Sequence, residues 1–469
     1  MKHVLRLTGR QYLALKTHLF PGDGCEAVAV ARCGRHSGED CHILTVREIE
    51  LIPHDACIER TSERVTWPTA PLNPLLAEAA RRGEAVVKFH SHPNGFAKFS
   101  WTDDAADKEL FASVYGWMDN EAPHASAVML PDGKLFGRVA RADGSFDALS
   151  LIAVAGDDLD FWFSDAASMQ DADDLPEFAR KNAQLFGTGT TARLARLSVA
   201  VVGCSGAGSP VVEQLARLGV GRLVLVDPDR LEAKNQNRIL NAMEQDVMAG
   251  RYKVDVLADA IGHMGLKTSV VPFARNVVDP EVVAAVAECD VVFGCMDGAE
   301  GRHLLGRLTT FYNLPYFDVG VKLLADGFGG IDQVCGTVHS VQPGGSSLLS
   351  RGVYTMEEVR DQSLKRTDPK AYADQLAEKY IVGAQEERPA VISVNMLAAS
   401  LAVGELLARL HPYRIDPNAD FAIQRFSLTD GYFQHEGEGD ACAVLTRHVG
   451  RGDVRPLLEM PSLGSLEKA

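Results

Sequence analysis

The chain has 469 residues, 46% hydrophobic and 23% charged, which is the balance of a globular protein and, at roughly 100–200 residues per domain, leaves room for several domains. Its formal net charge of -16 argues against nucleic acid as the main partner, because phosphate neutralisation requires clustered Lys and Arg. The nine cysteines include no Cys-x-x-Cys pair, and no apolar run suits a signal peptide or a membrane span, so we expect a cytoplasmic protein without disulfides.

Residues 1–160 predict a mixed domain of strands and helices. Short apolar runs indicate the strands, and an Ala-rich amphipathic run that begins near Thr102 indicates a helix. The predicted elements are strands at 28–30 and 42–46, a helix at 72–82, a strand at 86–90, the helix from about 102, and strands at 128–130 and 135–139.

The composition changes after this first domain. The stretch 161–177 is rich in Asp and Ala and predicts an acidic linker. Next come a predicted strand, a Gly-rich turn, a helix and a second strand, and this βαβ unit predicts a doubly wound, Rossmann-like domain over 178–445. Within it, the apolar stretch 391–410 predicts a buried helix. Residues 446–469 have little periodicity and predict a C-terminal tail.

A candidate metal site follows the strand predicted at 86–90. His90 and His92 are at positions i and i+2, so both project to the same side of the strand, and Asp103 can add an oxygen ligand. Two imidazoles and one carboxylate leave one tetrahedral position for water, as in catalytic zinc sites. Ser100 is placed to hydrogen-bond an oxyanion, and Glu26 is the candidate general base. A bare His-x-His is more often a pair of loop histidines, but the full pattern favours zinc.

This His-x-His-x7-Ser-x2-Asp pattern with an upstream Glu resembles the JAMM (MPN, Mov34/JAB) metallopeptidase family over about residues 1–160. The resemblance implies an α/β domain that uses zinc to hydrolyse peptide or isopeptide bonds after the C-terminus of ubiquitin or a similar protein. Glu48 and Glu50 also lie on a possible strand, and they remain alternatives to Glu26 as the base.

A candidate nucleotide site lies in the Gly-rich turn, which contains Gly203, Gly206 and Gly208. Glycines there allow a phosphate to approach a helix N-terminus, and Asp227 at the end of the next strand can bind ribose hydroxyls. Up to this point the pattern also fits a dinucleotide oxidoreductase. The polar residues that follow favour a triphosphate with magnesium instead. They are Asp229, Asn235, Arg238, Lys253, Asp297 and Arg302, with Arg180 upstream of the turn.

Together these residues resemble the ThiF/MoeB/ubiquitin-activating family over roughly residues 176–445. The resemblance implies that ATP and Mg²⁺ are used to adenylate the C-terminal glycine of a ubiquitin-like protein. Arg180, Arg238 and Lys253 would offset developing phosphate charge, and Asp297 would hold Mg²⁺. Because this family supplies the counterpart of Arg180 across a dimer, we expect a homodimer formed through the adenylation domain.

Two features of that family are missing. Ser347 and Ser350 occupy the positions of one Cys-x-x-Cys pair, and Cys442 stands alone near the second, so no structural zinc is expected in this domain. Ser363 falls where the catalytic cysteine normally lies. Three hypotheses stay open: the reaction stops at the acyl-adenylate, the acyl group passes to Ser363 as an oxyester, or Cys335 or Cys442 receives it.

The two patterns predict a bifunctional enzyme of a ubiquitin-like modification pathway. The peptidase would trim a precursor or remove the modifier, and the second domain would activate it for a conjugating-enzyme-like partner. The resemblance places such fusions in bacterial antiphage operons. One alternative is the activation of a sulfur-carrier protein for cofactor or siderophore biosynthesis. Another is a binding scaffold with both sites inactive, which the nearly complete motifs disfavour.

Overall fold

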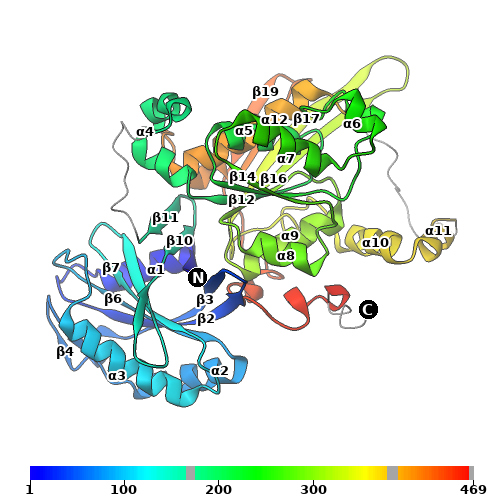
Figure 1. The fold of residues 1–469 in the computed structure, drawn as a ribbon. Helices are drawn as coiled ribbons and strands as arrows, with labels where there is room; N and C mark the ends of the chain where they lie inside the picture. The colour runs from blue at the N-terminus through cyan, green and yellow to red at the C-terminus, as the bar shows by residue number, and fades with distance from the viewer. Residues whose placement is uncertain (165–174, 378–388, 464–469) are drawn as a thin grey trace. The chain divides into compact units, whose positions relative to one another are not determined.

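The computed structural model describes residues 1–164, 175–377 and 389–463, and in it the chain forms two compact units (Figure 1). Unit 1 contains the described residues up to 164 together with 311–313 and 448–459, and unit 2 contains the remaining described residues. Both units are mixed α/β folds, which confirms the predicted fold class.

In the described part of unit 1, the central element is a nine-stranded sheet with the order β11-β10-β1-β3-β2-β6-β7-β8-β9. Its strands are β1 Lys2–Thr8, β2 Val28–Ser37, β3 Cys41–Leu51, β6 Ala85–Ser91, β7 His124–Met129, β8 Leu135–Ala140, β9 Phe146–Ala148, β10 Leu151–Ala155 and β11 Leu159–Phe163. A separate pair is formed by β4 Glu59–Arg60 and β5 Val65–Thr66. The helices are α1 Gly9–Leu19, α2 Asn73–Arg82 and α3 Trp101–Trp117.

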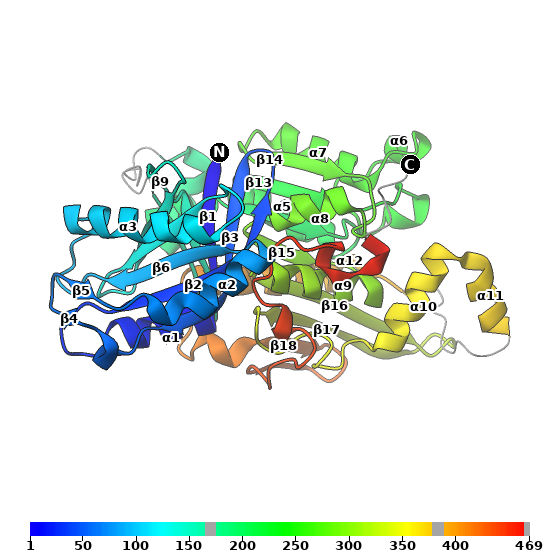
Figure 2. The same ribbon diagram turned by 90° about the horizontal axis from the view of Figure 1, so that it is seen from below.

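Strand β2 separates the two hydrophobic cores of unit 1. Ala29 and Ala31 pack in one core with Leu15 of α1, whereas Val28 and Val30 pack in a second core with side chains of α2 and α3. Because side chains alternate along a strand, both faces of this strand are apolar and buried. Helix α1 therefore covers one face of the sheet and α2 and α3 cover the other (Figures 1 and 2).

In the described part of unit 2, the central element is an eight-stranded sheet with the order β14-β13-β12-β15-β16-β17-β18-β19. The pairs from β14 to β16 are parallel, and those from β16 to β19 are antiparallel. The strands are β12 Ser198–Val202, β13 Arg222–Val226, β14 Ser269–Phe273, β15 Val291–Gly294, β16 Tyr316–Ala325, β17 Ile331–Val341, β18 Ile423–Ser427 and β19 Tyr432–Glu436. The helices are α4 Arg180–Leu194, α5 Gly208–Arg217, α6 Glu244–Met248, α7 Lys253–Met264, α8 Pro280–Ala287, α9 Ala299–Phe311, α10 Met356–Thr367, α11 Pro369–Ala377 and α12 Ile392–Leu410.

The strand order of unit 2 reverses at β12, which has β13 on one side and β15 on the other. Open α/β sheets bind ligands at such a switch point, at the carboxyl ends of the strands. The Gly-rich turn follows β12 there. Gly203 has a φ of 92°, and a Cβ on Gly208 would lie 1.8 Å from the carbonyl oxygen of Gly203, so both positions require glycine.

Helix α12 is the apolar helix predicted at 391–410. By length and composition it could cross a membrane, but 56% of its most apolar window is buried inside the protein. It packs against α5, β16 and β17, and Glu405 forms a buried ion pair at 2.7 Å with Arg409 one turn later. These contacts make α12 a core helix of unit 2.

The beginning of the predicted acidic linker is part of the sheet. Strand β11 ends at Phe163 and pairs with β10, so it occupies the first residues of the predicted linker at 161–177. Residues 165–174 of that prediction lie outside the described part of the chain.

The segment 446–469, predicted as a tail, supplies residues 448–459 to unit 1. The Gly34 N–H donates to the Gly450 carbonyl at 3.0 Å, and the Asp453 N–H donates to the Arg35 carbonyl at 2.7 Å. These backbone bonds go to the C-terminal part of β2, beyond Cys33, where its pairing with β6 ends. An aperiodic polar sequence does not reveal such bonds. Residues 464–469 lie outside the described part.

Candidate metal centre and nucleotide cavity

Three of the predicted metal ligands converge in unit 1. His90 and His92 lie at the end of β6, and Asp103 lies in the first turn of α3. Nε2 of His90 lies 3.1 Å from Nε2 of His92 and 3.0 Å from Oδ1 of Asp103, and Nε2 of His92 lies 3.4 Å from Oδ2 of Asp103. All three side chains are buried, so elements distant in the sequence present one buried donor set.

The donor set fits a zinc ion. Nδ1 of His92 lies 2.7 Å from the Phe96 carbonyl oxygen, which can only accept, so Nδ1 carries the proton and Nε2 keeps its lone pair. Burial lowers the pKa of His90 to about 4, so its imidazole is neutral, as a metal ligand must be. Two imidazole nitrogens and a carboxylate oxygen within 4.8 Å of one another match a three-ligand zinc site.

Ser100 lies beside this donor set as the N-cap of α3. The Asp103 N–H donates to its Oγ at 3.2 Å, while the Ser100 N–H and hydroxyl both donate to Oδ2 of Asp103 at 2.7 Å. The reciprocal bonds form a capping box, with Asp in place of the usual Glu. Ser100 therefore holds Asp103 in place, and its role as an oxyanion donor stays a prediction.

Among the candidate bases, Glu26 is buried with 5% of its surface exposed, two residues before β2. Burial raises the pKa of its carboxyl to about 7, with His92 and Asp103 among the charges that act on it. Glu48 and Glu50 are exposed, and Glu48 is paired with Arg32. The structure thus places Glu26, of the three, near the metal-binding residues.

A buried ion network behind the metal centre was not predicted. Nζ of Lys88 lies 2.7 Å from Oδ1 of Asp107, and Nη2 of Arg138 lies 2.8 Å from Oδ2 of the same carboxylate. The Arg138 guanidinium also lies 3.8 Å from the ring centre of Phe99 and 3.9 Å from that of Phe146. The network joins β6, α3 and β8, and its signal in the sequence was a charged residue inside each of two apolar strands, Lys88 in β6 and Arg138 in β8.

The predicted nucleotide residues of unit 2 meet at a cavity of 1310 Å³. It extends from the carboxyl ends of β12, β13 and β15 to a wall formed by β16, β17 and β18. Eight of the predicted residues line it, namely Gly203, Gly206, Asp227, Asp229, Asn235, Arg238, Lys253 and Asp297. Arg302 lines it as well, whereas Gly208 is buried at the start of α5.

Two acidic residues at the end of β13 have different surroundings. Oδ2 of Asp227 accepts the Cys204 N–H at 2.8 Å, and Oδ1 accepts the Asp229 N–H at 2.9 Å. The Asp227 carboxylate therefore fastens the Gly-rich turn to the strand, and burial raises its pKa. The exposed Asp229 side chain is the carboxylate that remains open to the cavity, and Lys253 Nζ lies 2.7 Å from its Oδ2.

Arg238 lies against the Gly-rich turn, since a Cβ on Gly206 would lie 3.2 Å from its Cδ. Asn235 is buried, and its Oδ1 accepts the Glu232 N–H at 3.1 Å, so it closes the short 3-10 helix that positions Arg238. Asp297 follows β15 and is exposed. The cavity thus combines the backbone of the Gly-rich turn, the cations of Arg238, Lys253 and Arg302, and the exposed carboxylates of Asp229 and Asp297. This set suits a nucleoside triphosphate with magnesium.

Besides Gly208, two predicted residues of the described chain do not line the cavity. Arg180 is exposed at the start of α4. Ser363 is half-buried in α10, one residue after Gln362, which lines the cavity. Helix α10 is fastened to the start of α9, because Gln362 Oε1 accepts the Glu300 N–H at 3.0 Å and Arg366 pairs with Glu300 at 2.7 Å.

The serines that replace a cysteine pair form hydrogen bonds with each other. The Ser347 N–H donates to Ser350 Oγ at 2.9 Å, and the Ser350 N–H donates to Ser347 Oγ at 3.2 Å. Burial raises the pKa of Cys442, but hydrogen bonds, first from Ser347 and also from Ser350, outweigh it and lower the pKa. Cys442 is 2% exposed, whereas Cys335 lines the cavity.

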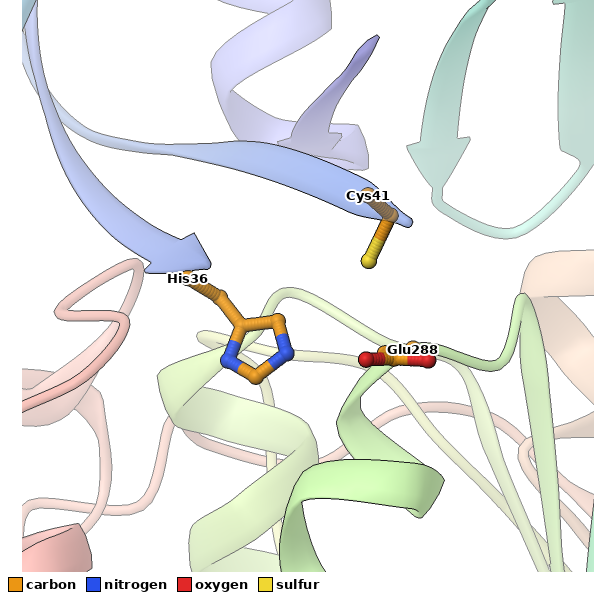
Figure 3. Close-up of side chains that lie close together, drawn as sticks. All are labelled: His36, Cys41 and Glu288. Atoms are coloured by element: carbon orange, nitrogen blue, oxygen red, sulfur yellow. The ribbon is translucent and has the colours of Figure 1, made fainter. Parts of the chain in front are cut away.

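Figure 3 shows the side chains of His36, Cys41 and Glu288, which are residue types that can bind metals. They do not all belong to the same unit. His36 and Cys41 lie at the ends of β2 and β3 in unit 1, and Glu288 follows α8 in unit 2. Within unit 1, Nδ1 of His36 lies 2.9 Å from Oδ1 of Asp453. His36 therefore serves to hold the segment 448–459.

Two family models match the chain. One, described as the ThiF family, matches residues 178–435, which include every residue of the nucleotide cavity. The other, described as prokaryotic homologs of the JAB domain, matches residues 24–134, which include Glu26, Ser100 and the three metal-binding residues. The matches confirm a JAB-like domain followed by a ThiF-type, Rossmann-like domain.

Curated proteins are similar over part of their length. The adenylyltransferase and sulfurtransferase MOCS3 of Bos taurus is 39% identical over 123 residues, which are 26% of this chain and 27% of that protein. Ubiquitin-like modifier-activating enzyme 5 of Culex quinquefasciatus is 28% identical over 183 residues, which are 36% of this chain and 43% of that protein. The chain thus spans less than half the length of these relatives.

Solved structures are similar at low identity. The microcin C7 biosynthetic enzyme MccB in complex with N-formylated MccA has a TM-score of 0.45 and 18% identity, over 59% of this chain and 76% of that chain. E. coli MccB with ATP has a TM-score of 0.41 and 20% identity, over 57% of this chain and 74% of that chain.

Proposed function

The chain belongs to the ThiF family, and from this premise we propose that unit 2 uses ATP to adenylate the C-terminal carboxylate of a ubiquitin-like protein. The observation that carries the proposal is the cavity that joins the Gly-rich turn, the Asp229–Lys253 pair and Arg238. A helix N-terminus behind a Gly-rich turn is a phosphate-binding arrangement. The names of the curated relatives, adenylyltransferase and modifier-activating enzyme, support the same reaction.

In the proposed reaction the carboxylate of the modifier attacks the α-phosphorus of ATP, and pyrophosphate leaves. Arg238 and Lys253 offset the negative charge that spreads over the phosphoryl oxygens, which is the main catalytic requirement of such a transfer. Asp297 binds the magnesium of the MgATP substrate. Arg180, exposed on α4, acts in the cavity of a second copy of the chain, so the active species is a homodimer.

An ATP–pyrophosphate exchange assay with ubiquitin-like proteins that end in glycine tests this function. Exchange should require both the protein and its terminal glycine, and Lys253→Ala should reduce it by about 100-fold or more, because a charge partner of the transferring phosphoryl group is lost. Lys370→Ala in α11, away from the cavity, is the matched control. No exchange with any such protein would count against adenylation.

The Ser363 hydroxyl then attacks the acyl-adenylate, so that the acyl group passes to Ser363 as an oxyester and AMP leaves with the acyl–phosphate bond broken. What supports this is the position of Ser363 in α10 next to Gln362, at the edge of the cavity. The adduct should resist thiols, react with hydroxylamine and disappear in Ser363→Ala. A thiol-labile adduct that survives Ser363→Ala and disappears in Cys335→Ser would favour a thioester at Cys335, and no adduct would favour a reaction that stops at the adenylate.

Unit 1 is proposed to be a zinc peptidase that trims the modifier precursor or removes the modifier from conjugates. His90, His92 and Asp103 would hold the zinc, which supplies Lewis acidity and lowers the pKa of a bound water. Glu26 accepts the proton of the attacking water, and Ser100 positions Asp103. A fusion of the modifier to a reporter protein tests the activity, since His92→Ala should abolish both cleavage and zinc binding.

The two activities fit a bacterial ubiquitin-like modification pathway, such as one that acts against phage, with a conjugating-enzyme-like partner. The rival is the activation of a sulfur carrier, and the similarity to a protein named adenylyltransferase and sulfurtransferase favours it. The JAB-like domain on the same chain favours the first. Co-purification with a conjugating-enzyme-like protein supports modification, whereas a sulfurtransferase partner supports the rival.

A further inference from the structure

One wall of the cavity in unit 2 carries two buried polar side chains without a nucleotide-binding role. Asp318 on β16 and His339 on β17 are directly opposite each other in the antiparallel pairing, so their side chains lie on the same face of the sheet. Both line the cavity, and they are only 1% and 5% exposed.

Each of these side chains has a buried polar atom that makes no hydrogen bond to the described residues. Oδ1 of Asp318 accepts from Arg302 Nε at 3.0 Å and from the Tyr316 hydroxyl at 2.8 Å. Oδ2 of Asp318 and Nδ1 of His339 have no hydrogen-bond partner among the described residues. Buried polar groups are nearly always paired, so an acceptor and an imidazole nitrogen at a cavity wall indicate a ligand with hydrogen bonds to offer.

The surroundings fix the states of His339 and of the Tyr316 hydroxyl that contacts Asp318. Burial, with help from Arg351 and Arg302, lowers the pKa of His339 to about 3, so the imidazole is neutral and carries one N–H and one lone pair. Burial raises the pKa of Tyr316, so its hydroxyl remains a donor to Asp318. Asp318 forms an ion pair with Arg302 at 3.0 Å, so its second carboxylate oxygen is available as an acceptor, and a phosphate group would not suit it.

The next residue of β16 on the same face as Asp318 is a glycine. Gly320, two residues further along β16, also lines the cavity, and a Cβ there would lie 3.3 Å from Arg302 Nη2. Asp318 is also close to the proposed reaction centre. It is paired with Gly294 of β15 in the sheet, and its partner Arg302 donates from Nη1 to the Asp297 carbonyl at 3.5 Å.

We propose that Asp318 and His339 form a binding subsite for the peptide backbone that leads to the adenylated carboxylate. Asp318 Oδ2 accepts the N–H of the last peptide bond of the modifier, and His339 pairs with the next peptide unit. The subsite selects a C-terminal residue that has a free amide N–H. The inference rests on the proposed adenylation, whose substrate it specifies.

Asp318→Asn is the decisive variant. Its amide oxygen can still accept from Arg302 and Tyr316, while its NH₂ group replaces the Oδ2 acceptor with a donor. Asp332→Asn makes the same change at an exposed position of β17 that does not line the cavity. The probes are two synthetic dodecapeptides of one sequence, ending in Gly-Gly or in Gly-sarcosine, where the N-methyl group removes the last peptide N–H.

Exchange kinetics and calorimetric titration are measured with both peptides. In the wild type, sarcosine should raise the peptide KM and Kd by about tenfold or more, since a buried acceptor is left unpaired. Asp318→Asn should raise them similarly for Gly-Gly, with little further effect of sarcosine and an unchanged KM for ATP. Asp332→Asn should match the wild type.

His339 gives a second variant pair. His339→Leu should weaken peptide binding by about tenfold, and His339→Gln, which keeps a donor and an acceptor, should retain most of the wild-type affinity. Equal affinity of the wild type for the two peptides, or a wild-type Kd in Asp318→Asn, would overturn the subsite. If the wild type binds the Gly-Gly peptide selectively but supports no exchange, adenylation fails and the subsite stands. If it shows neither binding nor exchange, both fail.

Discussion

Ser100 is a residue whose hydroxyl both caps a helix and holds the carboxylate of Asp103, a candidate metal ligand. Its reciprocal bonds with Asp103 close the first turn of α3. Ser100→Ala should therefore lower the free energy of unfolding by about 1 kcal/mol through the lost cap. It should also weaken zinc binding by about 10–100-fold, because residues that orient a ligand contribute that much. A chelator competition assay and urea unfolding measure the two effects.

The chain offers a matched control for this prediction in Thr355, the N-cap of α10. Thr355 makes the same reciprocal bonds with Glu358, at 3.2 Å from backbone N–H to hydroxyl and at 2.8 Å from backbone N–H to carboxylate. Thr355→Ala should lose the cap without changing zinc affinity. Unchanged zinc affinity in Ser100→Ala would show that Ser100 does not position Asp103.

Glu26 is the second residue at the metal centre that a substitution can isolate. Glu26→Gln keeps the volume of the side chain but cannot accept a proton, so peptide-bond cleavage should fall by at least about 100-fold, the contribution of a general base. Zinc content, measured by atomic absorption, should not change. Glu48→Gln, on an exposed side chain paired with Arg32, should leave the rate within about twofold. Loss of cleavage in the control instead would reassign the base.

At the scale of elements, the network around Asp107 holds α3 against β6 and β8. Asp107 is fully buried and shares its carboxylate between Lys88 and Arg138. Arg138→Met leaves this buried charge half-compensated and should lower the free energy of unfolding by about 3 kcal/mol, as broken buried pairs do. Arg141→Met, whose partner Asp147 is 48% exposed, should lower it by less than about 1 kcal/mol. Similar losses in the two variants would refute the role of the network.

The same network predicts a pH dependence of stability. Burial raises the pKa of Asp107, but the charges of Lys88 and Arg138 outweigh burial and hold the pKa below its ordinary value of 3.8. A lowered folded-state pKa means that the contribution to stability is present above 3.8 and is lost as the pH falls below it. The stability difference between Asp107→Asn and the wild type should thus shrink in acid, as urea unfolding at several pH values would measure.

Spacing in the sequence predicted the residues that lie on one strand end and the following helix, such as His90, His92 and Asp103. It did not predict Lys88, Asp107 and Arg138 as a cluster, because their contact depends on the order of strands in the sheet. In the same way, the register of β16 and β17 places Asp318 directly opposite His339. Local motifs can be predicted from a sequence, whereas contacts that depend on strand order and register cannot.

At the scale of the whole molecule, each unit carries its own site. The candidate metal ligands all belong to unit 1, and the residues that line the candidate nucleotide cavity all belong to unit 2. The chain nevertheless alternates between the units, since residues 311–313 and 448–459 are part of unit 1. Unit 1 therefore requires residues from the C-terminal part of the chain, and a fragment that ends at 164 would lack them.

This division predicts that metal removal separates the two proposed activities. A zinc chelator should abolish peptide cleavage and lower the unfolding temperature of unit 1, because a ligand that binds only the folded state stabilises it. Exchange of pyrophosphate into ATP should continue, provided that the chelator leaves Mg²⁺ free. Lys253→Ala should give the reverse result, with cleavage kept and exchange lost. If His92→Ala, which removes a zinc ligand without any chelator, also abolishes exchange, the sites are coupled and their independence is refuted.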